Sequence, residues 1–272
     1  MPKDCQYSDL NFRLNEVETN YGDNVHIVSN PFTLSMLAKL GSPESVQPRL
    51  NKYVEDLYMN LLQQVLNHLA PTALTTIETR MKEHVKEGEY SGLTFKKDQK
   101  FISVNLARAG IFPSHKCFEE LHYLFNAEGL RQDHFYINRK VDDQGQVVGV
   151  DVSGSKIGGP QEDAIVLFPD PMGATGGSLS YCIDHYKKNV EGMAKKYVAM
   201  HLIVTPEYIQ RMQKDHPDVE IFAIRLDRGL SDSSVLNSVP GTNPELERGL
   251  TDNQYIVPGA GGVGEILNNS FV

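Results

Sequence analysis

One short stretch of the chain, 170–178, combines residue types that can hold a phosphate group. It reads Asp170-Pro-Met-Gly-Ala-Thr-Gly-Gly-Ser178 and directly follows the continuous apolar run 164–168. A turn that leaves a buried strand lies at the carboxyl edge of a sheet, and a helix that begins there offers unpaired amides to an anion. The glycines let the backbone approach a phosphate closely, and Thr175 and Ser178 add hydroxyl donors. The stretch therefore predicts a phosphate-binding loop between a strand and a helix.

Asp170 indicates what the rest of the ligand is. A carboxylate does not favour a phosphate, so its natural role is to accept hydrogen bonds from hydroxyl groups, which points to a phosphorylated sugar. A glycine-rich turn with a Thr or Ser cap can also merely begin a helix, and an isolated turn of this kind more often does only that. The stretch lacks the GKS or GKT ending of a P-loop and the GxGxxG of a dinucleotide fold, so both are disfavoured.

The elements around this loop alternate between strand and helix. Apolar runs predict strands at 25–28, 101–106, 163–168, 198–204 and 219–226. Apolar residues at helical spacing predict helices at 32–40, 46–69, 118–125, 178–193 and 206–214. The pattern predicts an α/β fold with a parallel sheet covered by helices. The polar segment 134–151, with its turn sequence Asp142-Asp-Gln-Gly145, predicts a hairpin arm rather than a core strand.

The composition of the chain indicates which kinds of molecule it is not suited to bind. A formal net charge of -9 argues against a broad nucleic-acid surface, which needs clustered Lys and Arg. The three cysteines are scattered and suggest neither a disulfide framework nor a zinc site. No apolar run approaches the roughly 20 residues that cross a bilayer, and the first residues lack the plan of a signal peptide. We therefore expect a soluble cytoplasmic protein that binds neither nucleic acid nor membrane.

Two separated motifs resemble one enzyme family. Ile165-Val-Leu-Phe-Pro-Asp-Pro-Met-Gly-Ala-Thr-Gly-Gly-Ser178 resembles the phosphoribosyl-diphosphate loop of the uracil phosphoribosyltransferase family, and Tyr255-Ile-Val-Pro-Gly-Ala-Gly-Gly-Val-Gly-Glu265 resembles its uracil-binding segment, YIVPGLGDAGD. Asn30-Pro31, Glu78-Thr-Arg80 closing the long helix, and Arg108-Ala-Gly110 match in the expected order. The resemblance implies a single type I phosphoribosyltransferase domain over 1–272. It would contain a core sheet at 95–227 with a β-arm at 134–160, an insertion-like loop at 228–254, a base-binding segment at 255–272, and a small hood built from the N- and C-terminal segments.

The resemblance also implies a reaction and a set of site residues. The family transfers ribose 5-phosphate from 5-phosphoribosyl 1-diphosphate to uracil, which gives UMP and diphosphate. In this chain the 5-phosphate would lie on the loop Ala174, Thr175, Gly176, Gly177 and Ser178, with Asp170 on the ribose hydroxyls. Arg108 would bind diphosphate, joined by Arg139 and Lys156 from the arm. Uracil would contact Tyr255, Ile256, Gly261 and Gly262, read mostly by main-chain groups of Ile256 and Gly261. Mg²⁺ is implied through the substrate phosphates, and a homo-oligomer, a dimer or tetramer, is implied by analogy, with the 134–151 arm as a candidate contact.

Three positions depart from the family pattern. The usual Asp of the uracil segment is Gly262, the usual Arg-Asp on the arm is Arg139-Lys140, and the usual Lys-Leu-Pro is Lys156-Ile-Gly158. Loss of a carboxylate removes an acceptor for metal-bound water, and Asp to Lys reverses a charge near an anion. These departures leave two alternatives open: a non-catalytic protein that binds phosphoribosyl diphosphate or a nucleotide to regulate a partner, and a phosphoribosyltransferase for a different base.

Overall fold

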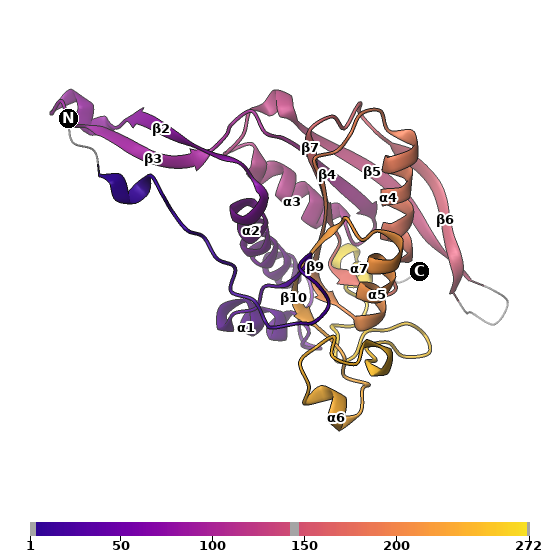
Figure 1. Cartoon of the computed structure of the whole chain (residues 1–272). Helices are drawn as coiled ribbons and strands as arrows, with labels where there is room; N and C mark the ends of the chain where they lie inside the picture. Colours follow the sequence, from indigo (N-terminus) through magenta and orange to yellow (C-terminus); the bar gives the residue numbers. More distant parts are fainter. Residues whose placement is uncertain (1–3, 142–146, 271–272) are drawn as a thin grey trace.

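A central sheet lies between two layers of helices in the computed structural model (Figure 1). The structure describes residues 4–141 and 147–270, without the side chains of 138–151. The strand order is β1-β10-β9-β7-β4-β5-β6, with the short β8 also paired to β9, and neighbours along this order run parallel except β5 and β6. The bounds are β1 Val25–Ile27, β4 Lys100–Ala107, β5 Leu130–Val141, β6 Val147–Lys156, β7 Ala164–Pro169, β8 Met172–Gly173, β9 Lys196–Val204 and β10 Glu220–Leu226.

Helices cover both faces of the sheet and bury two separate apolar cores. One face carries α1 Pro31–Leu40, α2 Arg49–Leu69 and α3 Ile111–Leu121, and the other carries α4 Gly177–Asn189 and α5 Pro206–Asp215. Strand β7 serves both cores, because Ile165 and Leu167 face the first while Val166 and Phe168 face the second. Its continuous apolar sequence is thus the consequence of burial on two sides. The predicted α/β fold with a mainly parallel sheet is confirmed.

Two predicted elements differ from the structure. The helix expected at 118–125 begins earlier, at Ile111, and ends at Leu121, while Phe125 packs into the core from the turn that follows. The interpretation of 134–151 as an arm and not a core strand is wrong at its start. Strand β5 pairs in parallel with β4 from Leu130 to Tyr136, and Phe135 is fully buried. The turn Asp142-Asp-Gln-Gly145 lies outside the described residues.

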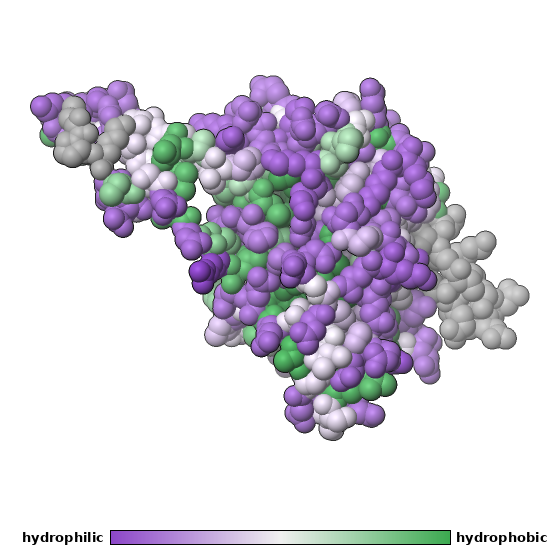
Figure 2. Space-filling view, in the orientation of Figure 1, coloured by the Kyte–Doolittle hydropathy of each residue, from purple (hydrophilic) through white to green (hydrophobic). Residues whose placement is uncertain are grey.

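A second hairpin, which the sequence patterns did not indicate, projects from the body of the molecule. Strands β2 Thr72–Glu78 and β3 Glu89–Phe95 pair in antiparallel register, and Figure 1 shows them extending away from the helical layer. The long helix ends at Leu69, so Glu78-Thr-Arg80 closes this hairpin strand and not the helix. Leu74 is 64% exposed and Ile77 47% exposed, and Figure 2 shows apolar surface on the arm.

The chain ends with short elements that cross the carboxyl edge of the sheet. Helix α6 Ser233–Leu236 precedes the segment that leads to α7 Val263–Asn268, and Figure 1 shows this C-terminal part below and in front of β9 and β10. None of the helices in the described part of the chain combines the length and the apolar character that crossing a bilayer requires.

Asp133 is the buried polar group that joins β5 to its neighbours. Its side chain is fully buried and accepts hydrogen bonds from Arg131 Nε at 3.0 Å, Tyr186 Oη at 2.6 Å and the Gly158 amide at 2.9 Å. These bonds link β5 to α4 and to the end of β6. Removing one partner of such a network leaves the others buried without an acceptor.

We predict that Asp133→Ala lowers the free energy of unfolding by about 2–4 kcal/mol, because three donors lose their acceptor. Urea denaturation followed by circular dichroism measures the change. Asp98→Ala, at an exposed carboxylate before β4, is the control and should change stability by less than about 0.5 kcal/mol. Equal values for the two variants would contradict the role of Asp133.

Candidate functional site

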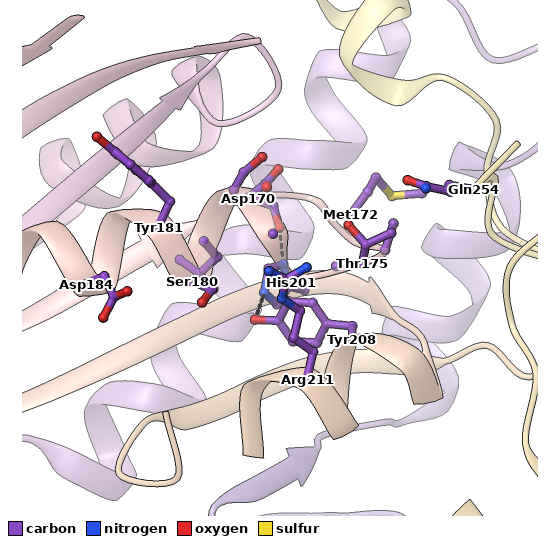
Figure 3. A pocket seen from close by; sticks show the side chains of 16 residues that line it. Asp170, Met172, Thr175, Ser180, Tyr181, Asp184, His201, Tyr208, Arg211 and Gln254 are labelled. Carbon is purple, nitrogen blue, oxygen red and sulfur yellow. Dashed lines mark hydrogen bonds between the residues drawn. The ribbon is translucent and has the colours of Figure 1, made fainter. Parts of the chain in front are cut away.

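The predicted phosphate loop leaves the carboxyl end of β7 and leads into α4. Gly176 is the residue before the helix and has φ of 75°, a left-handed conformation that favours glycine. The loop lines a cavity of about 530 Å³, shown in Figure 3. All the residues predicted to hold the 5-phosphate line this cavity together with Asp170, and they are Ala174, Thr175, Gly176, Gly177 and Ser178.

Hydrogen bonds from beneath fix the direction in which the loop peptides point. His201 Nδ1 lies 2.6 Å from the Asp170 carbonyl oxygen. The Thr205 amide donates to the Gly173 carbonyl at 3.1 Å, and Thr205 Oγ1 donates to the Ala174 carbonyl at 2.6 Å. Because the carbonyl groups face β9 and the start of α5, the opposite edge of the loop is left for amide groups.

The amides of Thr175, Gly176, Gly177 and Ser178 donate to no residue that the structure describes. The last two are at the first turn of α4, where a helix has no internal partner for its amides. A helix N-terminus also carries the positive end of the helix dipole. The loop can therefore bind an anion through four consecutive amide groups without losing any existing hydrogen bond.

His201 and Tyr208 form the buried support under the loop. His201 Nε2 lies 2.6 Å from Tyr208 Oη, and both side chains are 1% exposed (Figure 3). Burial lowers the pKa of His201 to about 4, although its hydrogen bond to the Asp170 backbone opposes the shift. The imidazole is thus neutral at pH 7. The carbonyl of Asp170 can only accept, so Nδ1 carries the proton and Nε2 accepts from the Tyr208 hydroxyl.

A second cavity of about 710 Å³ adjoins the first. Asp170, Met172, Ala174, Ser178 and Gln254 line both cavities. The second cavity is also lined by the other predicted residues that lie in this region, namely Arg108, Tyr255, Ile256, Gly261 and Gly262. The structure therefore brings the loop, Arg108 and the C-terminal segment around one connected hollow, with Asp170 between its two parts.

Arg108 lies just beyond the last residue of β4 and is half-buried. The peptide bond that joins it to Ala107 is cis. Its guanidinium donates through Nη1 to the Ser270 carbonyl at 3.0 Å and to Ser270 Oγ at 2.6 Å. A phosphate group at Arg108 would have to replace these oxygens with its own.

The buried Asp227 and the half-buried Arg225 hold the C-terminal segment in place. The Asp227 carboxylate accepts from the Gly259 amide at 2.7 Å and from Arg225 Nη2 at 2.7 Å. Arg225 Nη2 also donates to the Gly259 carbonyl at 3.1 Å. Both peptide groups of Gly259 are thereby tied to the end of β10, which fixes the turn that follows Pro258.

Main-chain groups of the same segment are left open. Ile256 forms an antiparallel bridge with Leu250, whose flanking bonds run from Val257 N to Gly249 O and from Thr251 N to Tyr255 O. In such a narrow pair the central residue turns its own N–H and C=O away from its partner. Neither group of Ile256 bonds to a described residue, nor does the amide of Gly261. These groups can bind a planar ligand in the second cavity.

The carboxylate of Glu265 occupies the space above Gly262. A Cβ on Gly262 would lie 2.1 Å from Glu265 Oε2 and 2.9 Å from Glu265 Cδ. Glu265 is half-buried and lines the second cavity with Arg108 and Asp170. Glu265 stands where the family segment YIVPGLGDAGD has its last Asp, so α7 keeps one of the two carboxylates of that segment, one helical turn after Gly262.

Comparison with known proteins identifies the family. The model of the family described as uracil phosphoribosyltransferase matches residues 27–245. The chain belongs to the uracil phosphoribosyltransferase family. It is 37% identical over 101 residues to a uracil phosphoribosyltransferase of Thermococcus kodakarensis, which is 37% of this chain and 42% of that protein. It is 37% identical over 105 residues to a uracil phosphoribosyltransferase of Chlamydia muridarum, which is 39% of this chain and 27% of that protein.

The chain thus spans less than half the length of the curated relatives it matches. Among solved structures, the AQ2163 protein from Aquifex aeolicus has the same fold, with a TM-score of 0.66 at 20% identity over 89% of this chain and 97% of that one.

Lys156 and Arg139, which the family resemblance indicates, both lie on the β5–β6 hairpin. Lys156 is exposed, pairs with His134 at the end of β6 and lines neither cavity. Arg139 pairs with Val150 in the β5–β6 hairpin, but its side chain is outside the described part of the structure. Their predicted contact with diphosphate stays a prediction.

Several residues of the site were not indicated by sequence reasoning. Gln254, with a left-handed φ of 62°, lines both cavities, and His201 and Tyr208 support the loop. The sequence contained one usable signal, a polar His201 inside the apolar strand 198–204, because a buried histidine needs polar partners. Glu265 could have been found as the counterpart of the last Asp in the segment YIVPGLGDAGD.

The neutral state of His201 predicts how the loop support responds to acid. A histidine with folded pKa about 4 and unfolded pKa about 6.5 loses stability as pH falls from 6.5 toward 4, since the unfolded chain takes up the proton first. We predict that His201→Gln destabilises the protein at pH 7 and that this difference shrinks by about 2 kcal/mol at pH 5.

Urea denaturation of both proteins at pH 7 and pH 5 measures this. His122→Gln, at an exposed histidine beyond α3, serves as the control and should change stability by less than about 0.5 kcal/mol. A His201→Gln effect that stays constant between the two pH values would show that His201 is not buried in its neutral form.

Proposed function

We propose that the protein is a uracil phosphoribosyltransferase: it transfers ribose 5-phosphate from 5-phosphoribosyl 1-diphosphate to uracil. The observation that carries the proposal is the row of unpaired amides at Thr175 to Ser178 beside a cavity with open main-chain groups at Ile256 and Gly261. The bond between C1 of the ribose and the diphosphate oxygen breaks, a bond from C1 to uracil N1 forms, and the N1 proton is released. The products are UMP and diphosphate.

The ribose phosphate fits the first cavity and its junction with the second. The loop amides would bind the 5-phosphate, with added bonds from the hydroxyls of Thr175 and Ser178. Asp170 lines both cavities, so its carboxylate would accept hydrogen bonds from the ribose hydroxyls between them. Departure of diphosphate gives C1 positive character, so catalysis rests on position and charge and needs no side-chain nucleophile.

The open main-chain groups at the second cavity suit uracil better than cytosine. The edge of uracil presents a donor at N3 between acceptors at O2 and O4, so a backbone C=O and N–H can each find a partner there. Cytosine reverses this pattern at N3 and at its amino group, which would set donor against donor and acceptor against acceptor. An unpaired polar group in a closed site is expensive, so the mismatch supports selection.

Mg²⁺ is proposed as the cation that accompanies diphosphate. No group of three or more metal-binding side chains is present among the described residues, but Mg²⁺ commonly uses one or two carboxylates together with substrate phosphates. Asp170 and Glu265 line the second cavity, and carboxylate oxygens are of the hard type that suits Mg²⁺. When bound, Mg²⁺ would neutralise charge on the departing diphosphate.

A non-catalytic regulatory protein is the second candidate. The contact between Arg108 and Ser270 favours it, because the C-terminal segment already occupies the guanidinium that diphosphate would use. Such a protein would bind phosphoribosyl diphosphate without turnover. A phosphoribosyltransferase for a different base is the remaining alternative, since a pocket formed by main-chain groups can change with the path of its loop.

One assay separates these functions. Diphosphate release is measured with phosphoribosyl diphosphate and Mg²⁺ in the presence of uracil, cytosine, hypoxanthine or adenine. We expect release with uracil alone. Release with another base would assign the different acceptor, and binding of phosphoribosyl diphosphate by calorimetry without any release would assign the regulatory function.

We predict that Asp170→Asn reduces kcat/KM at least tenfold, because an amide is a weaker acceptor for the ribose hydroxyls than a carboxylate. Steady-state kinetics with uracil and varied phosphoribosyl diphosphate measures the effect. Asp184→Asn, at a carboxylate on α4 that lines only the first cavity, is the matched control and should retain most activity. If the two variants lose activity equally, Asp170 has no special place in the site.

Glu265 and Gly262 predict an unusual pair of effects. Glu265→Ala should raise the Mg²⁺ concentration needed for half-maximal binding of phosphoribosyl diphosphate, because a carboxylate acceptor is removed. Gly262→Asp alone should cost little, since the atom that its Cβ would meet at 2.1 Å is the end of the flexible Glu265 side chain, which can rotate away. The double variant should recover much of the loss caused by Glu265→Ala, because a carboxylate returns to the same part of the cavity.

Calorimetric titration at several Mg²⁺ concentrations and steady-state kinetics measure the four proteins. A double variant that binds no better than Glu265→Ala would show that a carboxylate at position 262 cannot take the place of Glu265.

A further inference from the structure

The first cavity lies among acidic groups in an acidic protein. Three charged side chains line it: Asp170, Asp184 and Arg211. The chain as a whole carries a formal net charge of -9. A phosphate dianion at the loop would therefore enter a repulsive field that four amides oppose only in part. Arg211 is the cation that lines this cavity within the described part of the chain.

The packing of α5 brings Arg211 to the loop. Tyr208, held by His201, packs under the glycines: a Cβ on Gly173 would lie 3.2 Å from Tyr208 Cδ2. Arg211 follows Tyr208 by three residues and so emerges on the same side of the helix. A Cβ on Gly176 would lie 3.4 Å from both Tyr208 Cδ2 and Arg211 Cδ. Figure 3 shows Arg211 beside Tyr208 in the cavity wall.

The guanidinium is free to reach a ligand. Its side chain is 47% exposed, and its ion pair within α5, from Nε to Asp215 Oδ2, is long at 3.3 Å. An exposed pair of this kind contributes little to stability, so exchanging it for a phosphate costs little. The planar guanidinium can donate two parallel hydrogen bonds to phosphate oxygens, which a single amide cannot do.

We propose that Arg211 is a binding residue for the 5-phosphate, which it contacts from the α5 side while the loop amides contact it from the α4 side. The proposal rests on the proposed function, because it takes the loop as the 5-phosphate site. It adds a cation to a subsite otherwise built from main-chain groups and hydroxyls. Arg211 acts on binding and does not touch the reacting C1.

Titration of the full-length protein with ribose 5-phosphate, by calorimetry at low salt, tests this directly. Arg211→Gln should raise the Kd about five- to tenfold, and Arg211→Lys should raise it less, because the charge is kept and the fork is lost. Lys214→Gln is the matched control, since it removes the same charge from the same helix at an exposed position that lines neither cavity. It should leave the Kd unchanged.

The enzymatic readout separates this role from a structural one. Arg211→Gln should raise the KM for phosphoribosyl diphosphate and leave kcat within about twofold, with an effect that weakens as salt is added. A ribose 5-phosphate Kd that is the same in Arg211→Gln and wild type overturns the inference while the proposed function stands. A wild-type protein that binds no ribose 5-phosphate overturns both.

Discussion

The direction of four carbonyl groups decides what the phosphate loop can do. The carbonyls of Asp170 and Ala174 accept hydrogen bonds from the side chains of His201 in β9 and Thr205 just after it. The Gly173 carbonyl accepts from the Thr205 amide, and the Gly176 carbonyl accepts from an amide in the first turn of α4. Three of these carbonyls, those of Asp170, Gly173 and Ala174, are bonded on the side of β9 and Thr205, which leaves the opposite edge of the loop for amides. The site therefore depends on buried hydrogen bonds that no ligand touches, in which His201 is neutral and therefore a reliable donor.

The order of strands in the sheet then places the remaining groups. Strands β7 and β4 are neighbours, so the loop after one and Arg108 after the other meet at the same edge. The C-terminal segment reaches this edge because Asp227 and Arg225, at the end of β10, hold both peptide groups of Gly259. Residues almost 160 positions apart thus line one hollow. A parallel sheet with its loops at one end is well suited to such a site.

Features of the fold and the site could be predicted from the sequence where they depend on neighbouring residues, and not where they depend on residues far apart in the chain. The strand 164–168 and the loop after it were predictable, because burial on two faces and a glycine-rich helix start both leave local patterns. The start of α3 at Ile111 was missed since its first turn includes Pro113 and few regularly spaced apolar residues. Strand β5 was taken for an arm because its buried residue Phe135 stands among polar neighbours. The support from His201 depends on a partner 31 residues away, which no local pattern records.

The positions of the charged side chains around the two cavities indicate where a ligand would carry its own charges. Arg211 lines the first cavity only and Arg108 lines the second only, while Asp170 lines both; Asp184 adds a carboxylate to the first cavity and Glu265 adds one to the second. A ligand that suits this arrangement carries anionic groups at its two ends, near the arginines, and hydroxyl groups in the middle. There the Asp170 carboxylate can accept hydrogen bonds from hydroxyl groups but repels phosphate. A nucleoside triphosphate, with all its charge at one end, would leave one arginine without an anion. Phosphoribosyl diphosphate has its 5-phosphate and diphosphate on opposite sides of the ribose, so the two separate arginines agree with the proposed substrate better than with a nucleoside triphosphate.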